Sequence, residues 1–361
     1  MAIATSILEE AKRIHQLLQQ EEEVIVTVAL FGQPGAGKSS LINRITGQKL
    51  AKEGAKTDAT LEAKTYDWNG LHLVDLPGYG TTQFPQESYW KQFGIEDFDV
   101  FLCVFSGKFR DEDTVFFSQL KQHGKQCIFV RNKCDDLWED GKTVRELEVE
   151  IAADLEKQIR SREKVVFTSC RTGEGIAGLA TSIAGVLSGA KQERFYRGAK
   201  AYSKGFLDEK RRVCERYVAL AAAASAANAI NPVPGLDVAV DLSVLLSLFK
   251  KIRLTYGLTD ERLSTKGHAA PALAQLANNV VKYCAEDGVA LLLKSFAGRE
   301  TLKEVSKWIP LVGTVIAATA GYTIAHAAGR ACLGDCHQLA NGILERELAA
   351  TGAVGEKVID V

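Results

Sequence analysis

Several features that would assign a chain to a special class are missing from this sequence. Its 361 residues include 44 lysines and arginines and 45 acidic residues, so there is no basic excess to favour nucleic acid as a partner. The eight cysteines are scattered, and the close pair Cys332 and Cys336, with His337 behind it, matches no zinc or haem-attachment spacing. We therefore expect reduced thiols in a cytosolic protein that does not bind nucleic acid.

Signals for export and for membrane attachment are also missing. The N-terminus lacks the basic and apolar regions of a signal peptide, and Ala2 stands where N-myristoylation requires glycine. One uncharged stretch, 308–325, has about the length of a membrane span, but Pro310, Gly313 and Gly321 interrupt it. This pattern favours a buried helix or helical hairpin, so any contact with membranes is expected to be peripheral.

The region 22–190 alternates strands with helices. Its first apolar, β-branched run, Val24–Phe31, ends at a glycine and predicts a buried strand. Further strands are expected near 71–75, 100–105, 127–131 and 164–168, with helices between them. This alternation predicts an α/β domain whose mostly parallel sheet is covered by helices on both faces.

The two ends of the chain are predicted to be helical. A capping box at Ser6 and Glu9 opens an amphipathic helix within residues 1–21. From 191 to 361 no convincing strand is found, and helical segments rich in alanine and leucine are separated by a sharp break at Asn231–Gly235. Since both ends have apolar helical faces to bury, we expect one all-α domain into which the α/β domain is inserted.

The segment after the first strand, Gly-Gln-Pro-Gly-Ala-Gly-Lys-Ser, matches the P-loop pattern. Its glycines let backbone N–H groups converge on a β-phosphate, and the following helix presents its N-terminus to the same anion. Lys38 is expected to contact the β- and γ-phosphate oxygens and Ser39 to bind magnesium. The expected nucleotide-binding residues here are Gly32, Gly35, Ala36, Gly37, Lys38, Ser39 and Ser40.

A second motif, Asp-Leu-Pro-Gly, ends another strand with an acidic residue. Asp75 is placed to hold magnesium, directly or through water, and the N–H of Gly78 can bind the γ-phosphate. A threonine before Asp75 should complete the magnesium shell; of Thr57 and Thr60, Thr60 is preferred because it directly precedes the strand-like run 61–68. The expected catalytic contacts are Lys38, Thr60 and Gly78, and the expected metal ligands are Ser39, Thr60 and Asp75.

The third motif specifies the base. Asp135 can accept hydrogen bonds from the ring N–H and exocyclic amine of guanine, while Asn132 supports the loop and the stem of Lys133 covers the base. Adenine offers the wrong donors and acceptors and would leave a buried carboxylate unpaired. Ser169 and Cys170, after the last predicted strand, are expected to contact the base through their main chain. Together the motifs predict a site for GTP or GDP with Mg²⁺.

One group expected for hydrolysis is missing. Many small GTPases have a water-orienting glutamine directly after the glycine of the Asp-x-x-Gly motif, and this chain has Tyr79 there. An aromatic ring cannot orient water as an amide does. We therefore expect hydrolysis to be slow in the isolated monomer or to depend on groups from a partner.

The chain resembles the immunity-related GTPases, an interferon-inducible family related to dynamin-like GTPases. The resemblance rests on the P-loop, on the segments Asp75–Pro85 and Ser106–Arg110, and on Pro232–Asp241 and Ile309–Gly313 in the helical part. It covers most of the chain, and the alanine-rich composition also suits a bacterial relative. The resemblance implies a G domain, a helical domain built from both chain ends, GTP-dependent self-assembly and, in many members, association with membranes or pathogen vacuoles.

Three functions fit these motifs. The first is an enzyme that hydrolyses GTP and forms a homodimer or oligomer across its nucleotide face. The second is a GTP-dependent binding switch with negligible turnover, and the third is a peripheral membrane-remodelling protein that uses 308–325. Intact Lys38, Ser39 and Asp75 favour hydrolysis over an inactive switch. We therefore predict a cytoplasmic, self-assembling GTPase.

Overall fold

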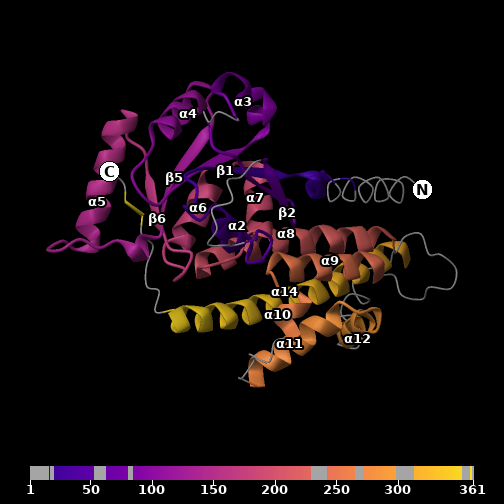
Figure 1. Cartoon of the computed structure of the whole chain (residues 1–361). Coiled ribbons are helices and arrows are strands. Elements are labelled where there is room, and N and C mark those ends of the chain that lie inside the picture. Colours follow the sequence, from indigo (N-terminus) through magenta and orange to yellow (C-terminus); the bar gives the residue numbers. More distant parts are fainter. Residues whose placement is uncertain are drawn as a thin grey trace. The chain divides into compact units, whose positions relative to one another are not determined.

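A computed structural model provides the structure of the protein. It describes residue 16 and residues 20–52, 62–79, 84–228, 242–264, 271–297, 313–351 and 358–359. The chain forms two compact units, one of Val24–Ser203 with Arg346–Val361 and the other of Met1–Glu23 with Lys204–Glu345 (Figure 1). Most of the helix predicted within residues 1–21 lies outside the described residues.

The first unit is built around a seven-stranded sheet with the strand order β2-β3-β1-β4-β5-β6-β7. The five strands from β3 to β6 in this order pair in parallel, and β2 and β7 pair antiparallel at the two edges. The strands are β1 Val26–Gly32, β2 Lys64–Trp68, β3 Leu71–Asp75, β4 Val100–Phe105, β5 Gln126–Asn132, β6 Val165–Thr168 and β7 Val358–Ile359. The predicted mostly parallel sheet is confirmed.

Helices of this unit contact the sheet in two groups. The first group, α2, α6 and α7, contacts β1, β3, β5 and β6, and the second includes α4 and α5. These helices are α2 Lys38–Thr46, α3 Gln86–Gln92, α4 Asp111–Gln122, α5 Val144–Ile159, α6 Ile176–Val186 and α7 Gly189–Gly198. The short 3₁₀ helices are η1 Ile95–Asp97 and η2 Cys134–Asp136.

The core of the sheet follows from the apolar strands. Every residue of β4 is buried, as expected for a central parallel strand covered on both faces. Side chains of one face, including Phe31, Phe101 and Phe129, form one cluster with Phe116 and Phe117 of α4. Each fully buried aromatic side chain contributes about 1.5–3 kcal/mol to folding. This cluster packs α4 against the sheet.

Two boundaries differ from the sequence-based expectation. The strand β7 pairs with β6, although no strand is predicted after residue 190; two residues are too few to show an alternating pattern. The C-terminal part of the helical unit also begins at Lys204 and not at 191. The reason is α7, which packs on β1 and β3 with Phe195 fully buried and therefore belongs to the sheet.

The second unit is all-helical in the residues that the structure describes. Its helices are α8 Lys204–Asn228, α9 Leu242–Thr255, α10 Asp260–Ser264, α11 Pro271–Tyr283, α12 Glu286–Ala297 and α14 Gly313–Thr351. The last residues of α14, from Arg346 on, belong to the sheet unit. Helix α9 buries Leu245, Phe249 and Ile252 at helical spacing, which the apolar periodicity predicts. Ion pairs join Glu21 to α8 and Glu22 to α9, at 2.5 Å and 2.7 Å.

The uncharged stretch 308–325 is helical over its described part. Its residues from Gly313 on belong to α14. Residues 308–312 lie outside the described residues, so the structure does not test the alternative of a helical hairpin. No helix in the described part of the chain is both long enough and apolar enough to cross a bilayer.

Candidate functional site

Two glycines of the loop between β1 and α2 have positive φ angles and close neighbours. Gly32 has φ 114°, and a Cβ there would lie 2.2 Å from the carbonyl oxygen of Val104. Gly37, which caps α2, has φ 94°, and a Cβ there would lie 2.3 Å from Nδ2 of Asn132. A side chain at either position would be strained by the positive φ and would collide with Val104 or Asn132. Ser39 and Ser40 follow in the first turn of α2.

The ammonium group of Lys38 lies next to the backbone of this loop. Its Nζ lies 3.3 Å and 3.4 Å from the carbonyl oxygens of Gly32 and Gln33 and 3.8 Å from Oδ1 of Asp75. The side chain is only 9% exposed, so the ammonium group is poorly hydrated and free to exchange weak carbonyl contacts for phosphate oxygens. This is the geometry that a phosphate-binding lysine needs.

Asp75 and Ser39 bring two oxygen donors together. Burial raises the pKa of Asp75, opposed by the charges of Lys38 and Lys64 and by a hydrogen bond from Ser39. Among the described residues, Oδ1 of Asp75 is buried without a hydrogen-bond partner. A buried carboxylate oxygen beside a serine hydroxyl is a donor set that suits a hard cation such as Mg²⁺. Thr57 and Thr60, the two candidates for a further ligand, lie outside the described residues.

Asn132 connects the predicted base-reading loop to the phosphate loop. Its Nδ2 donates to the carbonyl oxygen of Ala36 at 2.7 Å, and its Oδ1 accepts from Thr168 Oγ1 at 3.1 Å. The next residue, Lys133, adopts φ 59°, which turns the chain into η2 and leaves the lysine exposed. Asn132 therefore fixes the ends of β5 and β6 against the loop that precedes α2.

The carboxylate of Asp135 is held from the loop that follows β6. Arg171 donates to Oδ2 through Nε at 2.6 Å and through a terminal nitrogen at 2.5 Å. Burial alone would raise the pKa of Asp135, but hydrogen bonds from Ser169 and Arg171 outweigh burial, and the net pKa is lowered. Asp135 is therefore an ionised, oriented acceptor, as guanine recognition requires.

The family model for interferon-inducible GTPases (IIGP) matches residues 4–282 of this chain. The chain belongs to the interferon-inducible GTPase family. It is similar to interferon-gamma-inducible GTPase 10 of Mus musculus, 28% identical over 273 residues, which are 69% of this chain and 64% of that one. It is also similar to interferon-inducible GTPase 5 of Rattus norvegicus, 23% identical over 377 residues, covering 97% and 81%.

Among solved structures, the chain is similar to Toc33 from Arabidopsis thaliana in complex with Mg²⁺ and GMPPNP. The two are 18% identical with a TM-score of 0.37, and the match covers 52% of this chain and 94% of that one. Family membership confirms the resemblance seen in the motifs and makes this chain a GTPase with the P-loop fold. The Mus musculus relative extends well beyond the matched length.

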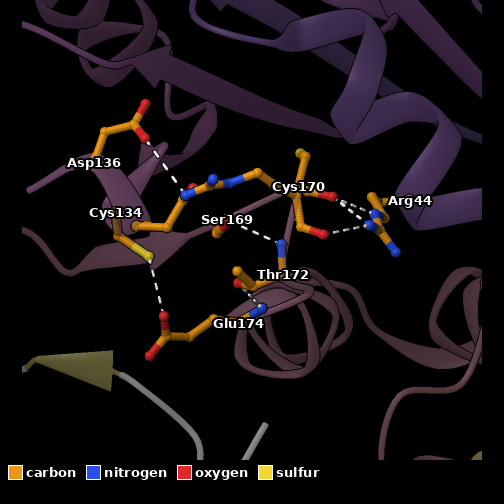
Figure 2. A network of polar contacts seen from close by, with 9 residues as sticks. Arg44, Cys134, Asp136, Ser169, Cys170, Thr172 and Glu174 are labelled. Carbon is orange, nitrogen blue, oxygen red and sulfur yellow. Dashed lines mark hydrogen bonds and ion pairs between the residues drawn. The ribbon is translucent and has the colours of Figure 1, made fainter. Parts of the chain in front are cut away.

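Two arginines that the motifs do not include complete the site of this GTPase. Besides Arg171, Arg44 at the end of α2 donates through Nε to the carbonyl oxygen of Cys170 at 2.7 Å and through a terminal nitrogen to that of Arg171 at 3.2 Å (Figure 2). The carbonyl oxygen of Cys170 thus accepts from Arg44, and the predicted main-chain contact of Cys170 to the base stays a prediction. No local pattern marks Arg44, because its partners lie more than a hundred residues away in the sequence.

The loop between β6 and α6 is further held by its own short-range contacts. Thr172 donates its N–H to Ser169 Oγ at 3.1 Å, and Ser169 donates its N–H to the carbonyl oxygen of Glu174 at 2.9 Å. The Glu174 carboxylate lies 3.7 Å from the sulfur of Cys134, beside the base-reading loop (Figure 2). The two loops that flank the expected guanine position therefore form one network.

Tyr79 belongs to the core of this GTPase. Its ring stacks on Phe116 at 4.7 Å and meets the edge of Tyr89 at 5.1 Å, and its hydroxyl donates to Gln119 Oε1 at 2.9 Å. The hydroxyl of Tyr89 in turn donates to the carbonyl oxygen of Pro77 at 2.6 Å. The side chain that stands at the glutamine position is therefore used to anchor the Asp-x-x-Gly turn to α4. The role of Gly78 at the γ-phosphate stays a prediction.

Proposed function

We propose that this GTPase binds GTP together with Mg²⁺ and hydrolyses it efficiently only when two copies assemble across their nucleotide faces. The observation that carries the proposal is Tyr79. Its ring packs between Phe116 and Tyr89 and its hydroxyl is bonded to Gln119, so it cannot orient an attacking water. Since the position that supplies a catalytic amide in many GTPases is committed to the core, the missing group must come from elsewhere.

The binding steps follow from residues already placed. Lys38 and the N-terminus of α2 bind the phosphates, and the ionised Asp135 accepts hydrogen bonds from guanine. Ser39 and Asp75 would hold Mg²⁺, which fits the buried carboxylate oxygen that has no hydrogen-bond partner among the described residues. The cation would offset phosphate charge in a partly dry site. The N–H of Gly78 would contact the γ-phosphate.

The topology favours a second copy as the source of the missing group. The phosphate loop, the Asp-x-x-Gly turn and the base-reading loop follow β1, β3 and β5, whose carboxyl ends share one edge of the sheet. Lys108 and Arg110, after β4, are exposed at the same edge. A partner docked there would exclude water and could place a cation near the transferred phosphate, as an arginine finger does. Family membership adds support for assembly between copies.

The proposal is tested by measuring turnover per molecule across a wide range of protein concentration. We expect specific activity to rise with concentration, and light scattering to show assembly with a non-hydrolysable GTP analogue but not with GDP. A flat activity curve, with monomers in both nucleotide states, would contradict self-assembly. That result would favour an external activator or a GTP-dependent binding switch.

A further inference from the structure

One buried carboxylate beside the phosphate site has no role in the function proposed above. Asp113 lies in the first turn of α4 and is 6% exposed. Its Oδ2 is buried and, among the described residues, has no hydrogen-bond partner. An ionised carboxylate left in this state is costly, because its lost hydration is not replaced. Such a group is retained at a functional site more readily than in a core.

The position of Asp113 is set by the face of α4 that packs on the Asp-x-x-Gly turn. Phe116, one helical turn later on the same face, contacts both Tyr79 and Tyr89. Tyr89 holds the carbonyl oxygen of Pro77. Burial raises the pKa of Tyr89, and the charge of Asp113 raises it further. Asp113 therefore lies close to the turn that is expected to receive the γ-phosphate.

The charged groups around Asp113 come from several elements. The pKa of its carboxyl is raised to about 6, because burial outweighs the opposing positive charges of Arg110 and Lys38, and the charge of Glu112 adds to the rise. Tyr89 on α3 and Cys103 on β4 also face this region. Both stay neutral near pH 7, because burial raises the pKa of each further above neutral. Asp113 is thus a carboxyl group that changes charge close to neutral pH, within electrostatic reach of the phosphate-binding lysine.

We propose that Asp113 couples the binding of nucleoside triphosphate to the uptake of protons by its carboxylate. The inference rests on the proposed function, since it requires phosphates to bind at Lys38. Bound phosphates add negative charge beside Asp113 and draw Lys38 toward themselves, so an ionised Asp113 becomes more unfavourable. A proton from solvent then adds to a carboxylate oxygen of Asp113, and no bond of the nucleotide breaks in this step. The triphosphate should cause more uptake than the diphosphate.

The sign of the pH dependence follows from linkage. Below about pH 6 Asp113 is protonated with or without nucleotide, and binding is tightest. Above both pKa values it is ionised in both states, and affinity is lower by about tenfold for each pKa unit by which the nucleotide raises it. Between the two values binding takes up protons. A rise of one unit gives an uptake of about half a proton near pH 6.5.

Isothermal titration calorimetry with a non-hydrolysable GTP analogue and Mg²⁺ measures this uptake directly. At about pH 6.5, in buffers of different ionisation enthalpy, the unmodified protein should take up about half a proton more than the Asp113→Asn variant. The matched control is Asp111→Asn, which removes an exposed charge from the same helical turn and should behave as the unmodified protein. Titration of the nucleotide itself is common to all three proteins and cancels in the comparison.

Affinity and thermal stability provide two independent readouts. Near pH 8 the Asp113→Asn variant should bind the analogue about tenfold more tightly than the unmodified protein. The nucleotide-free variant should melt about 2–4 °C higher, because an unpaired buried charge is removed. Equal proton uptake in the unmodified protein and the variant, or weaker binding by the variant near pH 8, would overturn the inference.

These outcomes are separable from failure of the proposed function. If the unmodified protein binds no guanine nucleotide, the function itself is wrong. If it binds tightly but takes up no more protons than the Asp113→Asn variant between about pH 6 and pH 8, only the role of Asp113 is wrong. If Asp113→Asn does not fold, Asp113→Ser takes its place, because the titration of the nucleotide itself cancels only in the comparison with a variant.

Discussion

The base side and the phosphate side of this nucleotide site satisfy their buried polar groups differently. On the base side, Asn132 donates to the phosphate loop and accepts from Thr168, and Asp135 is held by Arg171. On the phosphate side, Asp75 and Asp113 each keep a buried oxygen without a hydrogen-bond partner among the described residues. The base side therefore satisfies its polar groups within the protein, and the phosphate side leaves two carboxylate oxygens without a hydrogen-bond partner among the described residues.

The pKa directions show the same contrast. The pKa of Asp135 is lowered, because hydrogen bonds outweigh the effect of burial. The pKa values of Asp75 and Asp113 are raised, because burial outweighs the nearby positive charges. A carboxyl group whose pKa is lowered on folding stabilises the fold at neutral pH, and a carboxyl group whose pKa is raised destabilises it. The phosphate side thus carries an electrostatic cost that a cation or a proton can relieve when nucleotide binds.

Removing the buried ammonium group of Lys38 from the phosphate side should have the largest effect. Lys38→Ala deletes an ammonium group that lies 3.8 Å from Asp75 and is 9% exposed. We expect binding of GTP and GDP to weaken by about 2–5 kcal/mol, because a charge paired with phosphate is lost. Fluorescence titration of a labelled nucleotide measures this. Lys157→Ala, an exposed lysine on α5, is the control. Unchanged affinity in Lys38→Ala would refute the phosphate assignment.

Changing the acceptor on the base side should redirect specificity. Asp135→Asn exchanges an acceptor for a group that can also donate, which matches xanthine better than guanine. We expect GTP binding to weaken by about 1–3 kcal/mol and xanthosine triphosphate binding to strengthen. Asp136→Asn, with a side chain 65% exposed, should leave both affinities as they are. Competition assays with ATP provide the check, since equal binding of ATP and GTP by the unmodified protein is incompatible with guanine recognition.

A substitution at Tyr79 tests whether this side chain has a structural or a catalytic role. Tyr79→Phe removes the hydrogen bond to Gln119 and keeps the stacked ring. We expect the free energy of unfolding to fall by about 0.5–1.5 kcal/mol in urea, with turnover at saturating protein concentration unchanged. A collapse of turnover without loss of stability would mean that the hydroxyl reaches the reacting groups.

The smallest effect is expected at Arg171, which is 72% exposed. Arg171→Gln removes a donor that helps to lower the pKa of Asp135, and Arg171→Lys keeps the charge. We expect Arg171→Gln to lose about 0–1 kcal/mol of stability at neutral pH. Because a lowered carboxyl pKa stabilises the fold above its unfolded value, this difference should vanish as pH falls through the native pKa of Asp135. A difference that persists in strong acid would point to packing and not charge.

Local patterns predict the parts of this site that one motif contains. The phosphate loop, the strand before it and the helix after it are contiguous, and the positive φ angles of Gly32 and Gly37 belong to the local backbone, although their close contacts with Val104 and Asn132 arise from packing. The same holds for the loop that contains Asn132 and Asp135. The local sequence therefore predicts the course of the backbone in these segments, because it depends mainly on neighbouring residues in the chain.

Contacts between distant segments are not predictable in this way. The hydrogen bond from Arg44 to Cys170 forms only because α2 is packed in its place. The hydrogen bond from Tyr79 to Gln119 depends in the same way on the packing of α4. Asp113 looks like an ordinary acidic residue of a first helical turn until α4 is placed against the Asp-x-x-Gly turn. The sequence therefore predicts which residues define the site, and packing decides which of their neighbours control charge and orientation.

The central claim, that a second copy completes the catalytic site, is tested most directly by activation in trans. Unmodified protein is held with GTP at a concentration where its turnover is low. An Asp135→Asn variant, loaded with a non-hydrolysable xanthosine triphosphate analogue, is then titrated in. GTP hydrolysis by the unmodified protein should rise and saturate, whereas variant loaded with xanthosine diphosphate should have no effect. Turnover that stays at its starting value across the titration would contradict the account.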